Sequence, residues 1–255
     1  MTATAQSDVV LSASGLTKSF GAFLAVSDVD IDLRQGEIHA LIGPNGAGKT
    51  TLFNLLTKFH IPTSGTVVFM GQDITKLSPA AVARRGLVRS FQISAVFTNM
   101  TLLENVRVAL QGKAGLARQF WRGLSVLKSL DATAMNLLDT VGLADFAHMT
   151  AGELSYGRKR ILEIAVALAL EPKVLLLDEP MAGMGHEDID RISDLIRDVS
   201  MSRAVLMVEH NLKVVEHLCH RATVLQRGEI LASGPYAEVA ADERVRIAYM
   251  GADDD

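Results

Sequence analysis

The chain has 255 residues, a length that suits one large domain or two closely packed subdomains. Hydrophobic residues make up 49% and charged residues 21%, so a large core is available and global disorder is not expected. The net charge of -4 gives no electrostatic case for nucleic-acid binding, and the single cysteine excludes an intramolecular disulfide. No stretch reaches the roughly 18 uncharged apolar residues of a spanning helix, and no signal-peptide pattern opens the chain. We therefore expect a soluble protein that needs a partner for any role at a membrane.

The first third of the chain predicts mainly strands. One strand begins at Val9, residues 31–33 alternate as a half-buried strand does, and residues 38–42 form an apolar run. After a glycine-rich loop the apolar spacing predicts a helix over 51–56. A turn and a further strand are expected at 62–65 and 66–70.

The remainder combines a helical segment with alternating helices and strands. Leu, Ala and Met at helical spacing predict a helical region over 100–150, with a loop at 112–123. Two continuous apolar runs are typical of parallel strands that are buried on both faces. Their alternation with helices predicts an α/β core. The expected elements are helices over 162–170, 188–199 and 212–219, strands over 174–177 and 204–208, and a hairpin over 222–231.

The glycine-rich loop matches the phosphate-binding pattern G-x-x-x-x-G-K-S/T at every fixed position. The glycines let successive backbone N–H groups point at phosphate oxygens, and the following helix adds its positive end. The lysine supplies a charge for the β and γ phosphates, and the threonine hydroxyl can bind Mg²⁺. A chance glycine turn before a helix is the alternative. The residues are Gly43, Pro44, Asn45, Gly46, Ala47, Gly48, Lys49 and Thr50, followed by Thr51.

A second acidic site follows the apolar strand at 174–177. Asp178 and Glu179 come directly after it, and at the carboxyl edge of a parallel sheet such side chains face the ligand crevice. Asp178 can hold Mg²⁺ through water, and Glu179 can orient or deprotonate the attacking water. The alternative is a strand that merely enters solvent through charged residues.

A phosphate loop alone also allows a kinase or a GTPase. The segment Leu154-Ser155-Tyr156-Gly157-Arg158, however, resembles the LSGGQ signature of ABC ATPases. The chain from about residue 10 to 250 is similar to an ABC transporter nucleotide-binding subunit. The resemblance implies an α/β fold with a P-loop NTPase (RecA-like) core, an antiparallel β subdomain and a helical ABC signature subdomain. It implies one domain over 8–251, with the core and β subdomain in 8–92 and 161–251, the helical subdomain in about 93–160, and an acidic tail at 252–255.

The resemblance also implies roles for single residues. Phe20 falls where the family has an aromatic residue that stacks on adenine, with Val26 beside it as an ATP contact. Gln92 matches a glutamine that touches Mg²⁺ and the membrane partner, and His210 matches a histidine that reaches the γ-phosphate. With Glu179 and Lys49, His210 would be catalytic, and Mg²⁺ would be held by Thr50, Gln92 and Asp178.

The resemblance further implies partners. Two subunits would enclose two ATP molecules, each bound by one phosphate loop and, in trans, by the other subunit's Ser155, Tyr156, Gly157 and Arg158. The second subunit would be an identical copy or a paralogue. The pair would lie peripherally on the cytoplasmic face of the cell (inner) membrane, bound to transmembrane permease subunits, in a system with a periplasmic or extracellular solute-binding protein and no nucleic acid.

Three positions depart from the family pattern. Tyr156 replaces a glycine, Arg158 replaces a glutamine, and Gly185 stands where the family has Asp or Asn. The signature variant, the Ser-Phe-Gln of residues 90–92 and the ending 247–251 resemble the ATPases of branched-chain amino-acid importers. Importers of urea or amides, the ATPase of lipopolysaccharide export, and non-transport ABC ATPases are the alternatives.

Overall fold

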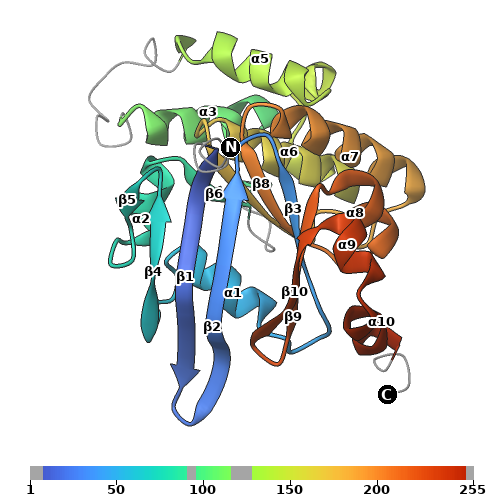
Figure 1. The fold of residues 1–255 in the computed structure, drawn as a ribbon. Helices are drawn as coiled ribbons and strands as arrows, with labels where there is room; N and C mark the ends of the chain where they lie inside the picture. Colours follow the sequence, from blue (N-terminus) through green and yellow to red (C-terminus); the bar gives the residue numbers. More distant parts are fainter. Residues whose placement is uncertain (1–7, 91–95, 116–127, 251–255) are drawn as a thin grey trace.

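The fold is known from a computed structural model that describes residues 8–90, 96–115 and 128–250 (Figure 1). The amino-terminal strands form an antiparallel sheet in the order β2-β1-β4-β5. This confirms the expected antiparallel β subdomain. The strands are β1 (Val9–Phe20), β2 (Phe23–Arg34), β4 (Ser64–Phe69) and β5 (Gln72–Asp73).

A second sheet has six strands in the order β10-β9-β3-β8-β7-β6. All neighbouring strands in it are parallel except β9 and β10, which form the expected hairpin. Because β3, β8 and β7 are adjacent and parallel, their carboxyl ends meet at one edge. The strands are β3 (Ile38–Ile42), β6 (Leu87–Arg89), β7 (Val174–Asp178), β8 (Ala204–Val208), β9 (Arg221–Gln226) and β10 (Glu229–Pro235).

Helices α3, α5, α6 and α7 gather at one end of the molecule, and α9 and α10 lie beside β10 (Figure 1). Local sequence fixes several helix starts: Thr101 and Glu104 form a reciprocal cap on α3, and Asn211 caps α8. Among the described residues no helix is long and apolar enough to cross a membrane. The helices are α1 (Lys49–Leu56), α2 (Pro79–Arg84), α3 (Leu102–Lys113), α5 (Asp131–Thr140), α6 (Tyr156–Leu168), α7 (His186–Ser200), α8 (Leu212–Leu218), α9 (Tyr236–Ala241) and α10 (Glu243–Met250).

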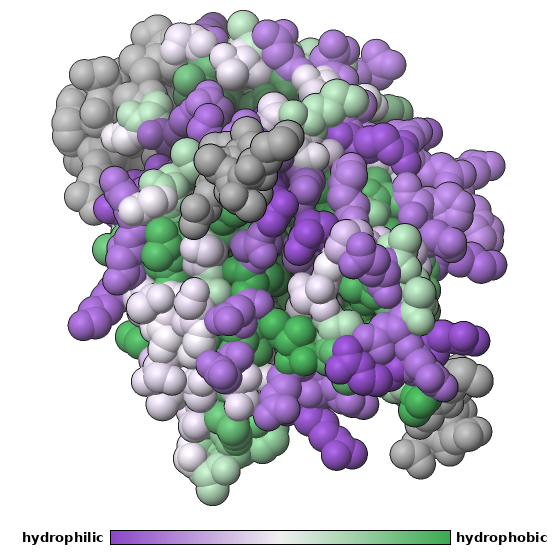
Figure 2. Space-filling view, viewed as in Figure 1, coloured by the Kyte–Doolittle hydropathy of each residue, from purple (hydrophilic) through white to green (hydrophobic). Residues whose placement is uncertain are grey.

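The six-stranded sheet separates two apolar clusters. In β7, Leu175 and Leu177 pack toward the helices, whereas Val174 and Leu176 pack against α1 and the antiparallel sheet. This is why the strand is a continuous apolar run rather than an alternating one. Figure 2 shows polar residues over much of the helices and an apolar tip on the β1–β2 hairpin, where exposed Phe20 and Phe23 lie.

The structure differs from the expected elements at several points. Helix α3 continues through Lys113, so the loop expected from residue 112 begins later. Helix α6 begins at Tyr156 rather than at 162. The elements α2, β5, β6, α9 and α10 were not predicted. Gln92 and most of the loop expected at 112–123 lie outside the described residues.

Candidate functional site

The expected site residues converge because three strands end in the same row of the sheet. Leu41 of β3 pairs with Val208 of β8, and Val208 pairs with Asp178 of β7. The chain continues from these positions into the phosphate loop, into Glu209 and His210, and into Glu179. Segments that are far apart in the sequence therefore meet at one crevice, as ligand sites of parallel sheets do.

Two glycines of the phosphate loop are required by close contacts with neighbouring strands. Gly43 has a φ of 145°, and a Cβ there would overlap the carbonyl oxygen of Leu225 in β9. Gly48 has a φ of 102°, and its Cβ would lie 2.6 Å from the carbonyl oxygen of Ala25. Any side chain at either position would thus force the loop away from the sheet.

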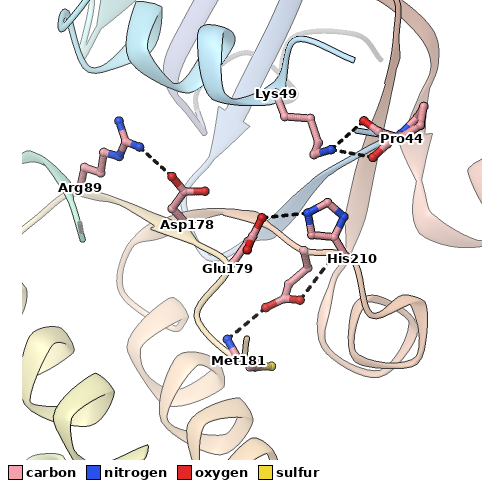
Figure 3. A network of polar contacts seen from close by, with 9 residues as sticks. Pro44, Lys49, Arg89, Asp178, Glu179, Met181 and His210 are labelled. Atoms are coloured by element: carbon pink, nitrogen blue, oxygen red, sulfur yellow. Dashed lines mark hydrogen bonds and ion pairs between the residues drawn. The ribbon is translucent and has the colours of Figure 1, made fainter. Parts of the chain in front are cut away.

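Lys49 is the first residue of α1, and its ammonium group is turned back into the phosphate loop. Its Nζ donates to the carbonyl oxygens of Gly43 at 2.6 Å and Pro44 at 2.9 Å (Figure 3). Burial lowers the pKa of Lys49, and the nearby carboxylates of Glu179 and Asp178 oppose this effect. The lysine is therefore a largely buried charge with acidic neighbours, and it contacts two carbonyl oxygens of the loop.

Glu179 and His210 face each other across the crevice (Figure 3). His210 Nε2 lies 2.8 Å from Glu179 Oε1. Glu179 has a φ of 48°, a left-handed conformation that costs a non-glycine residue about 1 kcal/mol or more and persists where surrounding contacts fix it. One such contact is a hydrogen bond from the backbone N–H of Glu179 to the carbonyl oxygen of Val208.

Asp178 is held by a partner that the sequence analysis did not identify. Arg89 Nη2 lies 2.7 Å from Asp178 Oδ2, and Arg89 Nη1 donates to Asn54 Oδ1 of α1 at 2.5 Å. The arginine also lies over the ring of Phe53. Asp178 is buried, so the pair is shielded from solvent. Arg89 ends β6, the strand next to β7, and only knowledge of that pairing could have linked the two residues.

An open cleft of about 290 Å³ lies over the phosphate loop. It is lined by Asn45 to Thr51 together with Phe23, Ala25, Glu179, Val208 and His210. Four expected ATP contacts do not line the cleft: Gly43 and Pro44, whose carbonyl oxygens accept from Lys49, and Val26 and Phe20. Val26 is fully buried beneath Gly48 and does not line the cleft, whereas its neighbour Ala25 does.

Two aromatic residues lie at the tip of the β1–β2 hairpin beside this cleft. Phe20 and Phe23 pair across the tip. The ring of Phe20 makes an edge contact with His60 at 5.4 Å between centroids, and Lys18 lies over it. Phe23 is more exposed and lines the cleft. Sequence reasoning missed Phe23 because either aromatic fits a hairpin tip.

The signature segment lies away from this cleft. Ser155 and Tyr156 are exposed at the start of α6, and the Ser155 hydroxyl caps the helix through the Arg158 N–H. The Tyr156 hydroxyl accepts from the guanidinium of Arg160 at 2.8 Å. Gly157 faces Asp188 of α7, whose carboxylate a Cβ at Gly157 would overlap. Ser155, Tyr156, Gly157 and Arg158 therefore do not meet the phosphate loop of their own chain.

These features together define an ATP-binding cassette. The sequence pattern of the ABC transporter family matches residues 26–182, and the chain belongs to this family. It is thus a nucleotide-binding ATPase with the P-loop fold expected from its sequence. A second pattern, that of the branched-chain amino acid ATP-binding cassette transporter, matches residues 229–255.

Curated relatives cover nearly the whole chain. The high-affinity branched-chain amino acid transport ATP-binding protein LivG of Escherichia coli (strain K12) is 38% identical over 96% of this chain and 99% of its own length. The corresponding protein BraF of Pseudomonas aeruginosa is 37% identical over 95% and 98%. A crystal structure of the ADP conformation of an ATP-binding cassette of an ABC transporter is 30% identical over 95% and 99%, with a TM-score of 0.83.

Proposed function

We propose that this chain is the ATPase subunit of an importer of branched-chain amino acids. The observation that carries the proposal is the similarity to LivG and BraF over almost the full length of each chain. The match of residues 229–255 to the branched-chain amino acid type adds support at the carboxyl end. Urea, amides or lipopolysaccharide are the competing cargoes, and they become outcomes of the transport test below.

In the proposed hydrolysis the chain's own residues bind ATP and orient and activate the attacking water. The amides of the phosphate loop and Lys49 bind the β and γ phosphates of ATP, with the positive end of α1 behind them. Glu179 orients and deprotonates the water that attacks the γ-phosphate. His210 contacts the γ-phosphate and fixes the Glu179 carboxylate, to which it lies 2.8 Å away. Phe23, and Phe20 behind it, contact the adenine end.

The residues around Asp178 suit Mg²⁺, which prefers oxygen ligands. Thr50, which carries a hydroxyl, lines the cleft, and Asp178 Oδ1 has no hydrogen bond among the described contacts, so each residue offers an oxygen ligand. We propose Thr50 and Asp178, with Gln92, as the residues that hold the ion. The bound ion would neutralise charge on the β and γ phosphates.

We further propose a dimer in which each signature segment completes the partner's site. Support comes from the exposure of Ser155 and Tyr156 at the start of a helix, where an anion can be bound, and from their separation from the cleft of their own chain. Tyr156 and Arg158 would then meet the nucleotide of a second subunit, identical or paralogous.

The membrane partner would dock beside Arg89. A groove of about 210 Å³ lies between α2, β6 and the end of α1, and its walls include Phe59, Ala83, Val88 and Arg89. Because Arg89 contacts Asp178, a permease segment in this groove lies one residue from the proposed metal site. The helical subdomain, proposed as about 93–160, would grip the same segment. We propose that the chain lies at the cytoplasmic face of the membrane, in a system that includes an external solute-binding protein.

The test is transport by the reconstituted system. The chain is co-expressed with the permease that copurifies with it and with a solute-binding protein for leucine, and the complex is placed in liposomes that contain ATP. Uptake of labelled leucine that requires ATP, and that stops with Lys49→Ala, supports the proposal. Uptake of urea or an amide instead, or export of a lipid, contradicts the assignment of cargo.

A further inference from the structure

Glu209 is a buried carboxylate between the last residue of β8 and His210. It is 4% exposed, and it does not line the nucleotide cleft. The backbone N–H of Met181 donates to its Oε1 at 3.2 Å, and the backbone N–H of His210 donates to its Oε2 at 3.2 Å. One side chain therefore holds two loops that follow different strands (Figure 3).

The first of these loops carries Glu179. Met181 is buried two residues after it, and the Ala182 N–H donates to the carbonyl oxygen of Glu179, which closes a tight turn. Since Glu179 has a left-handed backbone, its conformation depends on what fixes this turn. The bond from Met181 to Glu209 is one such restraint.

The second loop carries His210. Its backbone N–H is held by Glu209, while its imidazole reaches Glu179. The contacts form a closed circuit of four residues. The turn links Glu179 to Met181, Glu209 links Met181 to His210, and the His210 imidazole returns to Glu179. Displacement of either loop alone would break the circuit.

Burying a carboxylate at this position costs desolvation free energy. Burial raises the pKa of Glu209, and the backbone N–H groups of Met181, His210 and Asn211 oppose this effect. An apolar side chain would fill the same space without desolvating a charge. Two carboxylate oxygens, however, accept from two different loops at once, which an apolar side chain cannot do.

We propose that Glu209 is a positioning residue for ATP hydrolysis, which fixes the backbones of Met181 and His210 and thereby sets the side chains of Glu179 and His210 against each other. The inference rests on the roles proposed above for Glu179 and His210. Glu209 itself touches no part of the nucleotide.

The test compares Glu209→Gln with the wild-type full-length chain. Glutamine keeps the size but offers an NH₂ group to the N–H donors of one of the two loops. We expect kcat to fall at least about tenfold, because small displacements of reacting groups have large effects on rate. KM and the Kd for ATP should change less than about twofold, since the phosphate loop is not touched. Thr223→Val, which removes a buried hydrogen bond to His39, is the control for a general loss of stability.

Two further measurements separate positioning from simple stability. In Glu209→Gln the amides of Met181 and His210 should exchange hydrogen faster, while the amide of Glu179, bound to Val208, should not. In a His210→Ala background the same substitution should lower kcat less than about twofold further, because residues that act as a unit are not additive. Glu209→Asp, which keeps the charge but shortens the reach, should also lower kcat at least about tenfold.

The outcomes are distinct. Wild-type kcat in both Glu209 variants, or a loss of kcat matched by Thr223→Val at equal loss of stability, would overturn the inference while the wild-type chain still hydrolyses ATP. Unchanged exchange at Met181 and His210 would also overturn it. A wild-type chain that hydrolyses no ATP would instead contradict the proposed roles of Glu179 and His210.

Discussion

His210 Nε2 and Glu179 Oε1 lie 2.8 Å apart, although the two residues are on different loops and 31 positions apart in the chain. The contact joins the end of β7 to the end of β8 at the open side of the cleft. A water held by Glu179 and a phosphate held by His210 would therefore be presented to each other.

Lys49→Ala should weaken ATP binding about 10- to 100-fold, because a charged hydrogen-bond donor to phosphate contributes roughly 1.5–3 kcal/mol. The largely buried Lys49 ammonium is the charge closest to the loop's carbonyls. Titration with a fluorescent ATP analogue measures the change. Lys76→Ala removes an exposed lysine and should leave the affinity unaltered. Equal affinities in the two variants would refute the role of Lys49.

Arg89→Leu should destabilise the fold by about 3 kcal/mol, since it leaves the buried carboxylate of Asp178 without its partner. Denaturant unfolding of the free chain measures the loss. Asp178→Asn in the same background should recover much of it, because the unpaired charge is then removed. A loss below about 1 kcal/mol in the single variant would mean that solvent, rather than Arg89, stabilises Asp178.

His39 should make the fold less stable in mild acid. Burial lowers the pKa of His39 to about 4, with Arg221 contributing. Between pH 6.5 and 4 the unfolded chain therefore binds a proton that the folded chain does not. Stability is full above pH 6.5, falls as the pH drops to about 4, and loses about 3 kcal/mol in total from this group.

The matching measurement is denaturant unfolding across this pH range for the wild-type chain and His39→Asn. The difference in stability between the two should shrink or reverse toward pH 4. His217→Asn replaces an exposed histidine and is the control for the loss of an imidazole. The same slope in the wild-type chain and His39→Asn would disprove the prediction.

Gly185→Asp should raise the Hill coefficient of ATP hydrolysis. The substitution restores a carboxylate at the position where the resemblance to ABC ATPases implies Asp or Asn. Gly185 caps α7 with an extended backbone, and a Cβ would meet no atom within 4 Å. The change should therefore affect stability by only a few tenths of a kcal/mol. Gly185→Ala adds the Cβ without the carboxylate and is the matched control. An identical Hill coefficient in all three chains would show the departure to be neutral.

Features formed by residues that are adjacent in the sequence were predictable. The phosphate loop and the two carboxylates after β7 follow from local pattern, and the strand before each one is a buried run that is apolar except for His39 in β3. Helix α2 also had a local signal, because Ser78 caps it and Pro79 is its first residue. The orientation of Val26 was harder to predict. Ala25 and Val26 are both buried beside a register irregularity, so the alternation of apolar residues does not tell which one faces the cleft.

Contacts between residues that meet only because their strands are neighbours in the sheet were not predictable. Arg89 and Asp178 are 89 positions apart and meet only because β6 and β7 are neighbours. Glu209 reaches Met181 across 28 positions for the same kind of reason. Both pairs support residues that were predicted, so the sequence indicated the reacting groups but not the side chains that hold them.

The most direct test of the account is phosphate release by Glu179→Gln under saturating ATP and Mg²⁺, measured beside the wild-type chain. Glu179 is proposed to activate the attacking water, so its loss should lower the rate at least about 100-fold. ATP affinity should stay at the wild-type value, and the variant should remain a dimer in the presence of ATP, as measured by light scattering. Phosphate release at the wild-type rate would contradict the proposed mechanism.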